Sequence, residues 1–155
     1  MRKFNEFIDG IQTTPAVLLK TSLSIFLCSA ATLLLTIVGC LAVEMPSSFL
    51  LFGLGLFAIV FLFATNMLYT FAMKKYTVFD GVVIDSYGKG MLKWRKLEIV
   101  FAADDNETYS FSTKNFRFRL LAGDRVSVYC PEDTMIDDVN GVNVITSYYA
   151  FARHK

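Results

Sequence analysis

Residues 69–87 read YTFAMKKYTVFDGVVIDSY, and the periodicity of the sequence changes within this stretch. The residues before Lys74 end a long apolar run, whereas those after Lys75 alternate between apolar and polar or small side chains. A long apolar run is typical of a membrane-spanning helix, and alternation is typical of a β-strand. The two lysines therefore predict a boundary between a helical part, residues 15–75, and a strand-rich domain, residues 76–155.

Two apolar segments lie upstream of this boundary, at residues 16–43 and 47–73. Each exceeds the roughly 20 residues that a helix needs to cross a hydrocarbon layer of ~30 Å. Because the connection between them is so short, we expect antiparallel neighbours that form a transmembrane hairpin. A cleaved signal peptide is the alternative for the first segment, but this segment is longer than the roughly 7–15 apolar residues of such a peptide, and a second span follows at once.

The charges that flank the hairpin predict its orientation. Arg2 and Lys3 precede the first span, Lys74 and Lys75 close the second, and the tight loop carries only Glu44. Cytoplasmic flanks of membrane helices are enriched in Lys and Arg. We therefore expect a multi-pass protein of the bacterial inner (cytoplasmic) membrane, surrounded by the lipid bilayer, with both termini in the cytoplasm.

Residues 1–14 carry an amphipathic pattern. Phe4, Phe7, Ile8 and Ile11 fall at i, i+3, i+4 and i+7, the spacing of one helix face. Such a segment is expected to lie in the membrane interface as a short helix. A frayed terminus is the alternative.

Five strands are predicted in residues 76–155. Each is rich in β-branched or aromatic residues and is bounded by Gly, Asn, Asp or Pro. They lie near residues 77–87, 94–103, 108–113, 125–130 and 142–151. Five short strands in one small domain predict an OB- or SH3-like β-barrel, so that the fold class is membrane α + β.

The fourth predicted strand has a clear start and stop. Gly123 and Asp124 form the turn before it, and Pro131 cannot continue a central ladder. Alternation predicts that Val126, Val128 and Cys130 point to the core, while the three residues between and before them point outward: Arg125, Ser127 and Tyr129.

The same residues carry a resemblance. Three motifs resemble an uncharacterised bacterial family of membrane proteins with two helices and a small β-domain: Asp80-Gly81-Val82-Val83, Glu107-Thr108-Tyr109-Ser110-Phe111, and the pattern Gly-Asp-x-Val-x-Val-Tyr-x-Pro-Glu-Asp at 123–133. The layout is also similar to NfeD-like proteins, whose membrane helices precede an OB-type barrel. The resemblance implies a membrane-tethered β-module without known catalysis, and it transfers a fold but no active site.

Composition places the chain in the membrane class and argues against an enzyme. The 155 residues are 54% hydrophobic, and 15 basic side chains nearly balance 14 acidic ones. Cys28, Cys40 and Cys130 show no paired spacing, and His154 is the single histidine. These counts exclude a disulfide framework and an ordinary zinc site, and they leave little material for a nucleophile–histidine–acid arrangement. We expect no catalytic activity, no metal and no cofactor.

Small polar side chains predict where the spans meet another helix. Ser24, Cys28, Thr32, Thr36 and Cys40 recur at every fourth residue of the first span. Small residues let helix backbones approach closely. The partner is either the second helix of the same hairpin or another copy of the chain. Asn66 in the second span is predicted to make an interhelical hydrogen bond, to Thr32 or Thr36, or to a second membrane subunit.

A basic stretch in the domain predicts a membrane-facing surface. Lys89, Lys93, Trp94, Arg95 and Lys96 combine cations, which favour an anionic leaflet, with a tryptophan, which favours the headgroup region. The alternative is a solvated edge strand that its charges protect from aggregation.

A second basic stretch offers a partner surface at Lys114, Arg117 and Arg119. Interleaved phenylalanines would suit single-stranded nucleic acid on an OB-like barrel. However, residues 74–155 hold twelve Lys and Arg against eleven Asp and Glu, which makes nucleic acid unlikely as a ligand. Basic and acidic stretches are segregated, which favours orientation of a protein partner or of adjacent copies.

The sequence therefore predicts a non-catalytic, membrane-anchored assembly or accessory protein that binds protein partners or itself, with no small-molecule substrate. Two alternatives remain: a small transport or pore component, and an immunity or exclusion protein that inhibits another membrane complex.

Overall fold

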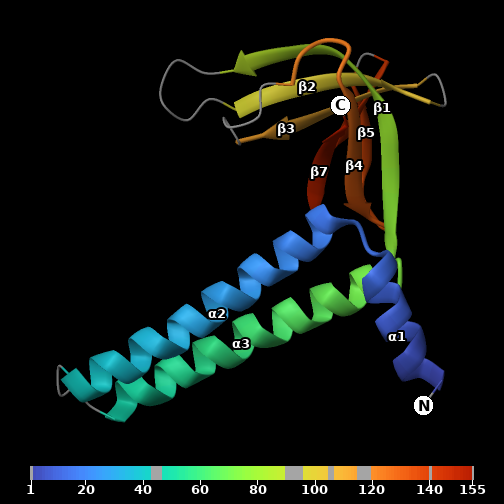
Figure 1. Ribbon diagram of the computed structural model, residues 1–155. Helices are drawn as coiled ribbons and strands as arrows, with labels where there is room; N and C mark the ends of the chain where they lie inside the picture. The colour runs from blue at the N-terminus through green and yellow to red at the C-terminus, as the bar shows by residue number, and fades with distance from the viewer. Residues whose placement is uncertain are drawn as a thin grey trace. The chain divides into compact units, whose positions relative to one another are not determined.

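The computed structural model describes residues 2–42, 47–89, 96–104, 107–114, 120–139 and 141–154. The chain divides into two compact units, Met1–Lys75 and Tyr76–Lys155. The first unit contains the helices α1 (Arg2–Thr13), α2 (Ala16–Ala42) and α3 (Ser47–Ala72), and the second contains the strands (Figure 1).

Helices α2 and α3 are both long and apolar enough to cross a membrane, which confirms the prediction of two long apolar helices. They pack side by side (Figure 1). Two contacts show that the helices are antiparallel: the rings of Phe26 and Phe61 lie 5.5 Å apart, whereas Thr36, later in α2, abuts Gly53, earlier in α3.

Helix α1 packs against the C-terminal end of α3. A Cβ atom on Gly10 would collide with the carbonyl group of Ala72, so only glycine allows this close approach. The Thr14 hydroxyl lies 2.7 Å from the carbonyl oxygen of Gly10, to which it donates, and 3.4 Å from that of Phe71. One face of α1 is therefore occupied by α3, and Ile8 on the other side remains 39% exposed.

Helix α3 ends in a Schellman motif. The Lys75 N–H donates to the Thr70 carbonyl and the Lys74 N–H donates to the Phe71 carbonyl, each at 3.0 Å. Lys74 has φ of +54°, the left-handed conformation that this motif requires and that glycine usually supplies. The helix therefore ends at Ala72, and three residues separate it from the first strand, which begins at Tyr76.

Seven strands form one sheet in the second unit. They are β1 (Tyr76–Lys89), β2 (Lys96–Ala103), β3 (Thr108–Thr113), β4 (Arg125–Pro131), β5 (Ile136–Val139), β6 (Val142–Ile145) and β7 (Ala150–His154). Their order in the sheet is β5-β6-β3-β2-β1-β4-β7. All neighbours are antiparallel except β3 and β6, which are parallel.

The prediction of a closed five-stranded barrel is wrong in two respects. The predicted strand at 142–151 is two strands, β6 and β7, and β5 was missed, so the count is seven. The sheet is also open, because its order is linear and ends at β5 and β7. The physical reason is a change of partner: β6 continues the sheet beside β3, whereas β7 pairs with β4 near the opposite end.

The sheet nevertheless curls so strongly that its two ends approach each other. Residues 146–149 carry the chain from β6 to β7, and five Cα–Cα steps span at most about 18 Å. Along this segment the Tyr148 hydroxyl donates to the Ser112 carbonyl of β3, and the Tyr149 N–H donates to the Tyr129 carbonyl of β4. The gap between the sheet's halves is bridged by this segment rather than by a strand ladder.

Strand β1 makes the bend possible. Its first half pairs with β4 and its second half with β2, and the register shifts between Val83 and Asp85. A β-bulge of this kind bends a strand and increases its twist. Gly81 sits where both pairings overlap, and a Cβ atom there would collide with the Ala102 carbonyl and the Phe101 ring.

The core lies inside the curl and includes residues from β1 through β4 and β6. Val126, Val128 and Cys130 of β4 are fully buried, which confirms their predicted direction. Ser127 and Tyr129, which were predicted to point outward, are also buried, at 5% and 8% exposure. They alternate with the core residues, and on this second face side chains of the neighbouring strands surround them: Asp80 and His154 contact Ser127, and the ring of Tyr76 lies 5.9 Å from that of Tyr129.

Candidate functional site

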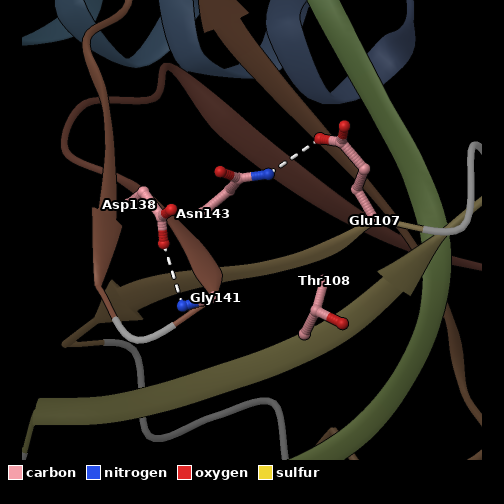
Figure 2. Close-up of a pocket in the computed structure, with 5 residues that line it drawn as sticks. All are labelled: Glu107, Thr108, Asp138, Gly141 and Asn143. Carbon is pink, nitrogen blue, oxygen red and sulfur yellow. Dashed lines mark hydrogen bonds between the residues drawn. The ribbon is translucent and has the colours of Figure 1, made fainter.

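A polar hollow of about 380 Å³ lies beside the β5–β6 hairpin (Figure 2). The described residues that line it are Glu107, Thr108, Asp138, Gly141 and Asn143. They supply two carboxylates, one amide and one hydroxyl, but no basic side chain. The hollow is therefore acidic.

Strand pairing brings these residues together. Asp138 of β5 lies opposite Asn143 of β6, and Asn143 lies opposite Tyr109 of β3. Glu107 precedes β3 and lies two residues before Tyr109. Its Oε2 atom accepts hydrogen bonds from the Asn143 amide at 2.8 Å and from the Tyr109 hydroxyl at 2.9 Å. Tyr109 is buried in the core, so the Glu107 carboxylate is held in a fixed position.

The second carboxylate of the hollow is held by the hairpin turn. One Asp138 oxygen accepts the Gly141 N–H at 2.9 Å, as Figure 2 shows. Gly141 has φ of +80°, which a tight hairpin turn requires and glycine tolerates. A cationic group is the chemical complement of this arrangement. The described part of the chain contains no group of three or more His, Cys, Asp or Glu side chains that could hold a metal ion.

A second polar cluster spans three adjacent strands. The Ser127 hydroxyl of β4 donates to a carboxylate oxygen of Asp80 on β1, and Nε2 of His154 on β7 lies 2.8 Å from the same hydroxyl oxygen. A serine hydroxyl has one proton. Because that proton points to Asp80, the His154 Nε2 atom must carry the proton of the second hydrogen bond.

This geometry differs from that of a nucleophilic serine. A catalytic histidine accepts the serine proton at Nε2 while the carboxylate orients the other side of the imidazole ring. Here the serine proton points to the carboxylate and the histidine donates, so the serine–histidine–carboxylate relay of such an enzyme is not formed. Nearby, burial raises the pKa of Tyr129, and the negative charge of Asp80 raises it further. The cluster stabilises the junction of β1, β4 and β7.

The predicted stripe of small residues on α2 meets α3 only in part. Thr36 is buried, Thr32 and Cys40 are half-buried, and Ser24 and Cys28 are exposed. A spacing of four residues advances by about 40° around a helix at each step, so such a stripe drifts away from a straight seam. The buried polar residues of α2 instead fall seven apart, at Ser22, Ser29 and Thr36. This is the spacing that keeps side chains on one seam.

Asn66 is exposed on α3, six residues before the helix ends. The threonine hydroxyls that were considered as its partners donate to carbonyl groups of their own helix: Thr32 to Cys28 at 2.9 Å and Thr36 to Thr32 at 2.8 Å. About 9 Å of helix separates Asn66 from the end of α3, so its amide lies nearer to the helix end than to the middle.

The basic residues predicted to face membrane or partner lie mostly outside the described part of the chain. Lys93, Trp94, Arg95, Arg117 and Arg119 lie outside it. Lys89 and Lys96 form the last pair of the β1–β2 ladder, and Lys114 follows β3 as an exposed residue.

Sequence reasoning missed both polar clusters. For the hollow, a signal was present: Asn140-Gly141, between the short segments IDDV and VNVI that each begin and end with a β-branched residue, is a strong local indication of a hairpin. For the second cluster, the residues are separated by 47 and 27 positions in the chain. Only the strand order, which no local pattern encodes, brings Asp80, Ser127 and His154 together.

Comparison of the chain with protein-family models, with curated proteins and with solved structures finds no match. The resemblance to two-helix membrane proteins with a β-domain therefore rests on the layout of two apolar helices and a separate sheet unit.

Proposed function

We propose that this protein is a non-catalytic, membrane-anchored accessory protein, in which α2 and α3 hold the chain in a bacterial inner membrane and the sheet unit binds a protein partner or a second copy. One observation carries the membrane part of the proposal: the outer surface of the helical pair is apolar and exposed. Side chains at least 60% exposed occur along both helices, namely Leu27, Leu34, Leu35, Leu41, Leu51, Phe52, Ile59 and Leu62. Contiguous apolar surface of this extent is expected to contact lipid or protein rather than water.

The orientation follows from the flanking charges. Lys74 and Lys75 follow the end of α3, and Arg2 and Lys3 precede α2 in the sequence. The connection between α2 and α3 contains no Lys or Arg. The positive-inside rule then favours a cytoplasmic sheet unit. Because the loop between α2 and α3 is short, a partner outside the membrane would meet the protein mainly through the sheet unit.

The chemistry of the described residues supports a binding role over a catalytic one. Ser127 donates to Asp80 and accepts from His154, which is not the serine–histidine relay of a hydrolase, and the serine is only 5% exposed. Cys130 is fully buried, and burial raises its pKa to about 11, which keeps the thiol protonated and unreactive at neutral pH.

Membrane extraction tests the anchoring. After alkaline carbonate treatment the protein is expected to stay with the membrane pellet, and a C-terminal fluorescent-protein fusion is expected to fluoresce while a C-terminal periplasmic phosphatase fusion stays inactive. Release of the protein into the supernatant would overturn the membrane anchor. An active phosphatase fusion would reverse the orientation.

Purification of the tagged full chain in mild detergent, followed by native mass determination, tests the accessory role. A mass above that of the single chain, 17.5 kDa, is expected, from a second protein or from further copies. A monodisperse single chain at every detergent concentration tested would argue against the accessory role.

A further inference from the structure

Strand β5 is an edge of the sheet with half of its backbone groups directed away from the fold. In the described residues it pairs only with β6, through Ile136↔Ile145, Asp137↔Val144, Asp138↔Asn143 and Val139↔Val142. Val139 and Val142 flank a two-residue connection, so they form a hydrogen-bonded pair, and so do Asp137 and Val144 two residues away. The N–H and C=O groups of Ile136 and Asp138 therefore point outward.

Apolar side chains accompany these outward groups. Met135, Ile136 and Val139 are 76%, 41% and 52% exposed. The opposite edge is different, because the side chains of β7 are engaged: Phe151 contacts Phe111, Arg153 pairs with Asp124 and His154 contacts Ser127. Of the two edges, β5 is the one whose apolar side chains remain in contact with solvent.

The acidic hollow lies on one face of this same edge. Side chains two residues apart in a strand share a face, so Ile136 and Asp138 lie side by side on the face where Asp138 lines the hollow with Glu107. Ile136 is paired with Ile145, a residue of the core, and therefore lies at the rim of the core layer. A strand added beside β5 would therefore fit best with an apolar side chain next to Ile136 and a cationic side chain next to Asp138.

We propose that β5 accepts an extended segment of a partner protein as a further strand, with an apolar side chain next to Ile136 and a Lys or Arg, two residues along, reaching toward the hollow of Asp138 and Glu107. The main-chain hydrogen bonds of an added strand supply affinity, and the alternate side chains supply specificity. This inference rests on the proposed partner-binding function and names its surface.

Charge selects the occupant. If β5 paired with the β5 strand of a second copy in antiparallel orientation about a twofold axis, the central residue would lie opposite its own copy, because directly opposite residues share a face of the sheet. With the axis at either central residue of β5, Asp137 would lie opposite Asp137 or Asp138 opposite Asp138. Like charges directly opposite each other destabilise a strand pair. The two aspartates therefore disfavour pairing between copies, while they favour a basic segment.

The test uses the full chain in detergent or nanodiscs and two synthetic probes, a short peptide that alternates valine and lysine and a matched peptide that alternates valine and glutamate. Binding is followed by amide hydrogen exchange resolved at β5. The lysine peptide is expected to slow exchange at Ile136 and Asp138, and the glutamate peptide is expected to leave both unchanged. Equal effects of the two peptides, or no change at β5 with a saturating lysine peptide, would overturn the proposal.

Two substitutions remove equal charge from neighbouring positions. Asp138→Asn keeps an oxygen for the Gly141 N–H but removes the charge beside the hollow, and is expected to weaken binding of the lysine peptide by about fivefold. Asp137→Asn removes a charge from the opposite face of β5 and is expected to weaken binding of the lysine peptide by less than about twofold. Equal weakening by both substitutions would mean that net charge, not the hollow, selects the peptide, and would contradict the inference.

Ile136→Pro tests the backbone contact. Since the Ile136 N–H points outward, proline there removes a donor from the added ladder and none from the β5–β6 pair. Loss of peptide binding is expected. If a stoichiometric partner co-purifies equally with wild type and with the Ile136→Pro protein, the accessory function stands and the β5 surface is wrong. If neither protein retains a partner or further copies, the accessory function itself fails.

Discussion

Gly53 of α3 lies directly against the side chain of Thr36 on α2, so close that a Cβ atom on the glycine would overlap the threonine Oγ1 and Cγ2 atoms. Helix pairs in membranes associate through such close packing, since lipid provides no hydrophobic drive between helices. We expect Gly53→Ala to destabilise the α2–α3 pair by about 1–3 kcal/mol through overpacking. The midpoint of thermal unfolding of the detergent-solubilised full chain measures this change.

Gly55 provides a matched control for that substitution. It lies two residues away in the same helix, and a Cβ atom there meets nothing within 4 Å. Gly55→Ala is expected to leave the midpoint unchanged or to raise it slightly, because alanine is a better helix former than glycine. If Gly53→Ala and Gly55→Ala shifted the midpoint equally, the close contact with Thr36 would not be the basis of the packing.

The stability of the sheet unit is expected to fall at alkaline pH because of Cys130. Burial raises the pKa of this thiol from 9.0 to about 11. Below pH 9 the thiol is neutral in the folded and unfolded states; as the pH rises from 9 to 11 the unfolded state ionises first. The stabilisation lost over this range is on the order of 2 kcal/mol, because one pKa unit corresponds to about 1.4 kcal/mol.

Cys130→Ala isolates this contribution from other groups that titrate in the same range. The variant is expected to be less stable than wild type by about 1 kcal/mol at pH 7, owing to the small cavity, and this difference is expected to shrink and then reverse between pH 9 and pH 11. Urea-denaturation midpoints at each pH measure both effects. A maleimide reagent is expected to label Cys130 only after unfolding, and rapid labelling of the native thiol would contradict its burial.

Acid pH is expected to weaken the turn before β4 through Asp124. The backbone N–H of Leu121 donates to this carboxylate at 2.7 Å and lowers its pKa below 3.8, and Arg153, at 2.8 Å, lowers it further. The unfolded state therefore binds the proton first as the pH falls below about 4, and stability present above that pH is lost. We expect Asp124→Asn to lower the urea midpoint at pH 7 and to flatten its dependence on pH between 5 and 3.

Asp104 supplies the control for Asp124. It pairs with Arg125 at 3.0 Å, but both side chains are about 60% exposed. Exposed pairs contribute about 0–1 kcal/mol, so Asp104→Asn is expected to have a smaller effect at pH 7. An equal loss of stability in both variants would indicate that overall charge, rather than the Leu121 and Arg153 contacts, is responsible.

Ser127 is expected to act in stability and not in chemistry. Ser127→Ala removes hydrogen bonds to Asp80 and His154 and is expected to lower the free energy of unfolding by about 1–3 kcal/mol. Ser112→Ala, at an exposed position of β3, is the control and is expected to change it by less than about 0.5 kcal/mol. Covalent labelling of Ser127 by a fluorophosphonate probe would show an activated hydroxyl and would overturn this assignment.

Local patterns predicted the helices and the first four strands because their information is local. The apolar runs around Leu34 and Phe57 and the alternation from Val126 to Cys130 are each contained in one short stretch. The split of residues 142–151 into β6 and β7 is different, since it depends on where each half finds a partner. Nothing between Val142 and Phe151 specifies that β6 pairs with β3 and β7 with β4.

The polar clusters show the same division. The hairpin that carries Asp138 is encoded locally by Asn140-Gly141 and was predictable in principle. The contact of Ser127 with Asp80 and His154 depends on the order of β1, β4 and β7 in the sheet, and the burial of Ser127 on the second face of β4 depends on the same order. The alternating pattern of β4 predicted that the Ser127 side chain points away from the core, but it could not predict which side chains surround it there.

The hydroxyl groups along the α2–α3 seam have a mechanical consequence. Ser22 and Thr36 donate to carbonyls within α2, and only Ser29 among the buried seam residues reaches across, at 3.5 Å from the Phe57 carbonyl. Helices of 27 and 26 residues are about 40 Å long, which exceeds a ~30 Å hydrocarbon layer, so the membrane insertion proposed above would create hydrophobic mismatch. Tilting of the whole hairpin would relieve the mismatch, and because the Ser22 and Thr36 hydroxyls bond within α2, small adjustments between the helices would cost few hydrogen bonds. In the proposed membrane setting, the hairpin would tilt as one unit in bilayers of different thickness, with its two helices held together by the Gly53–Thr36 contact.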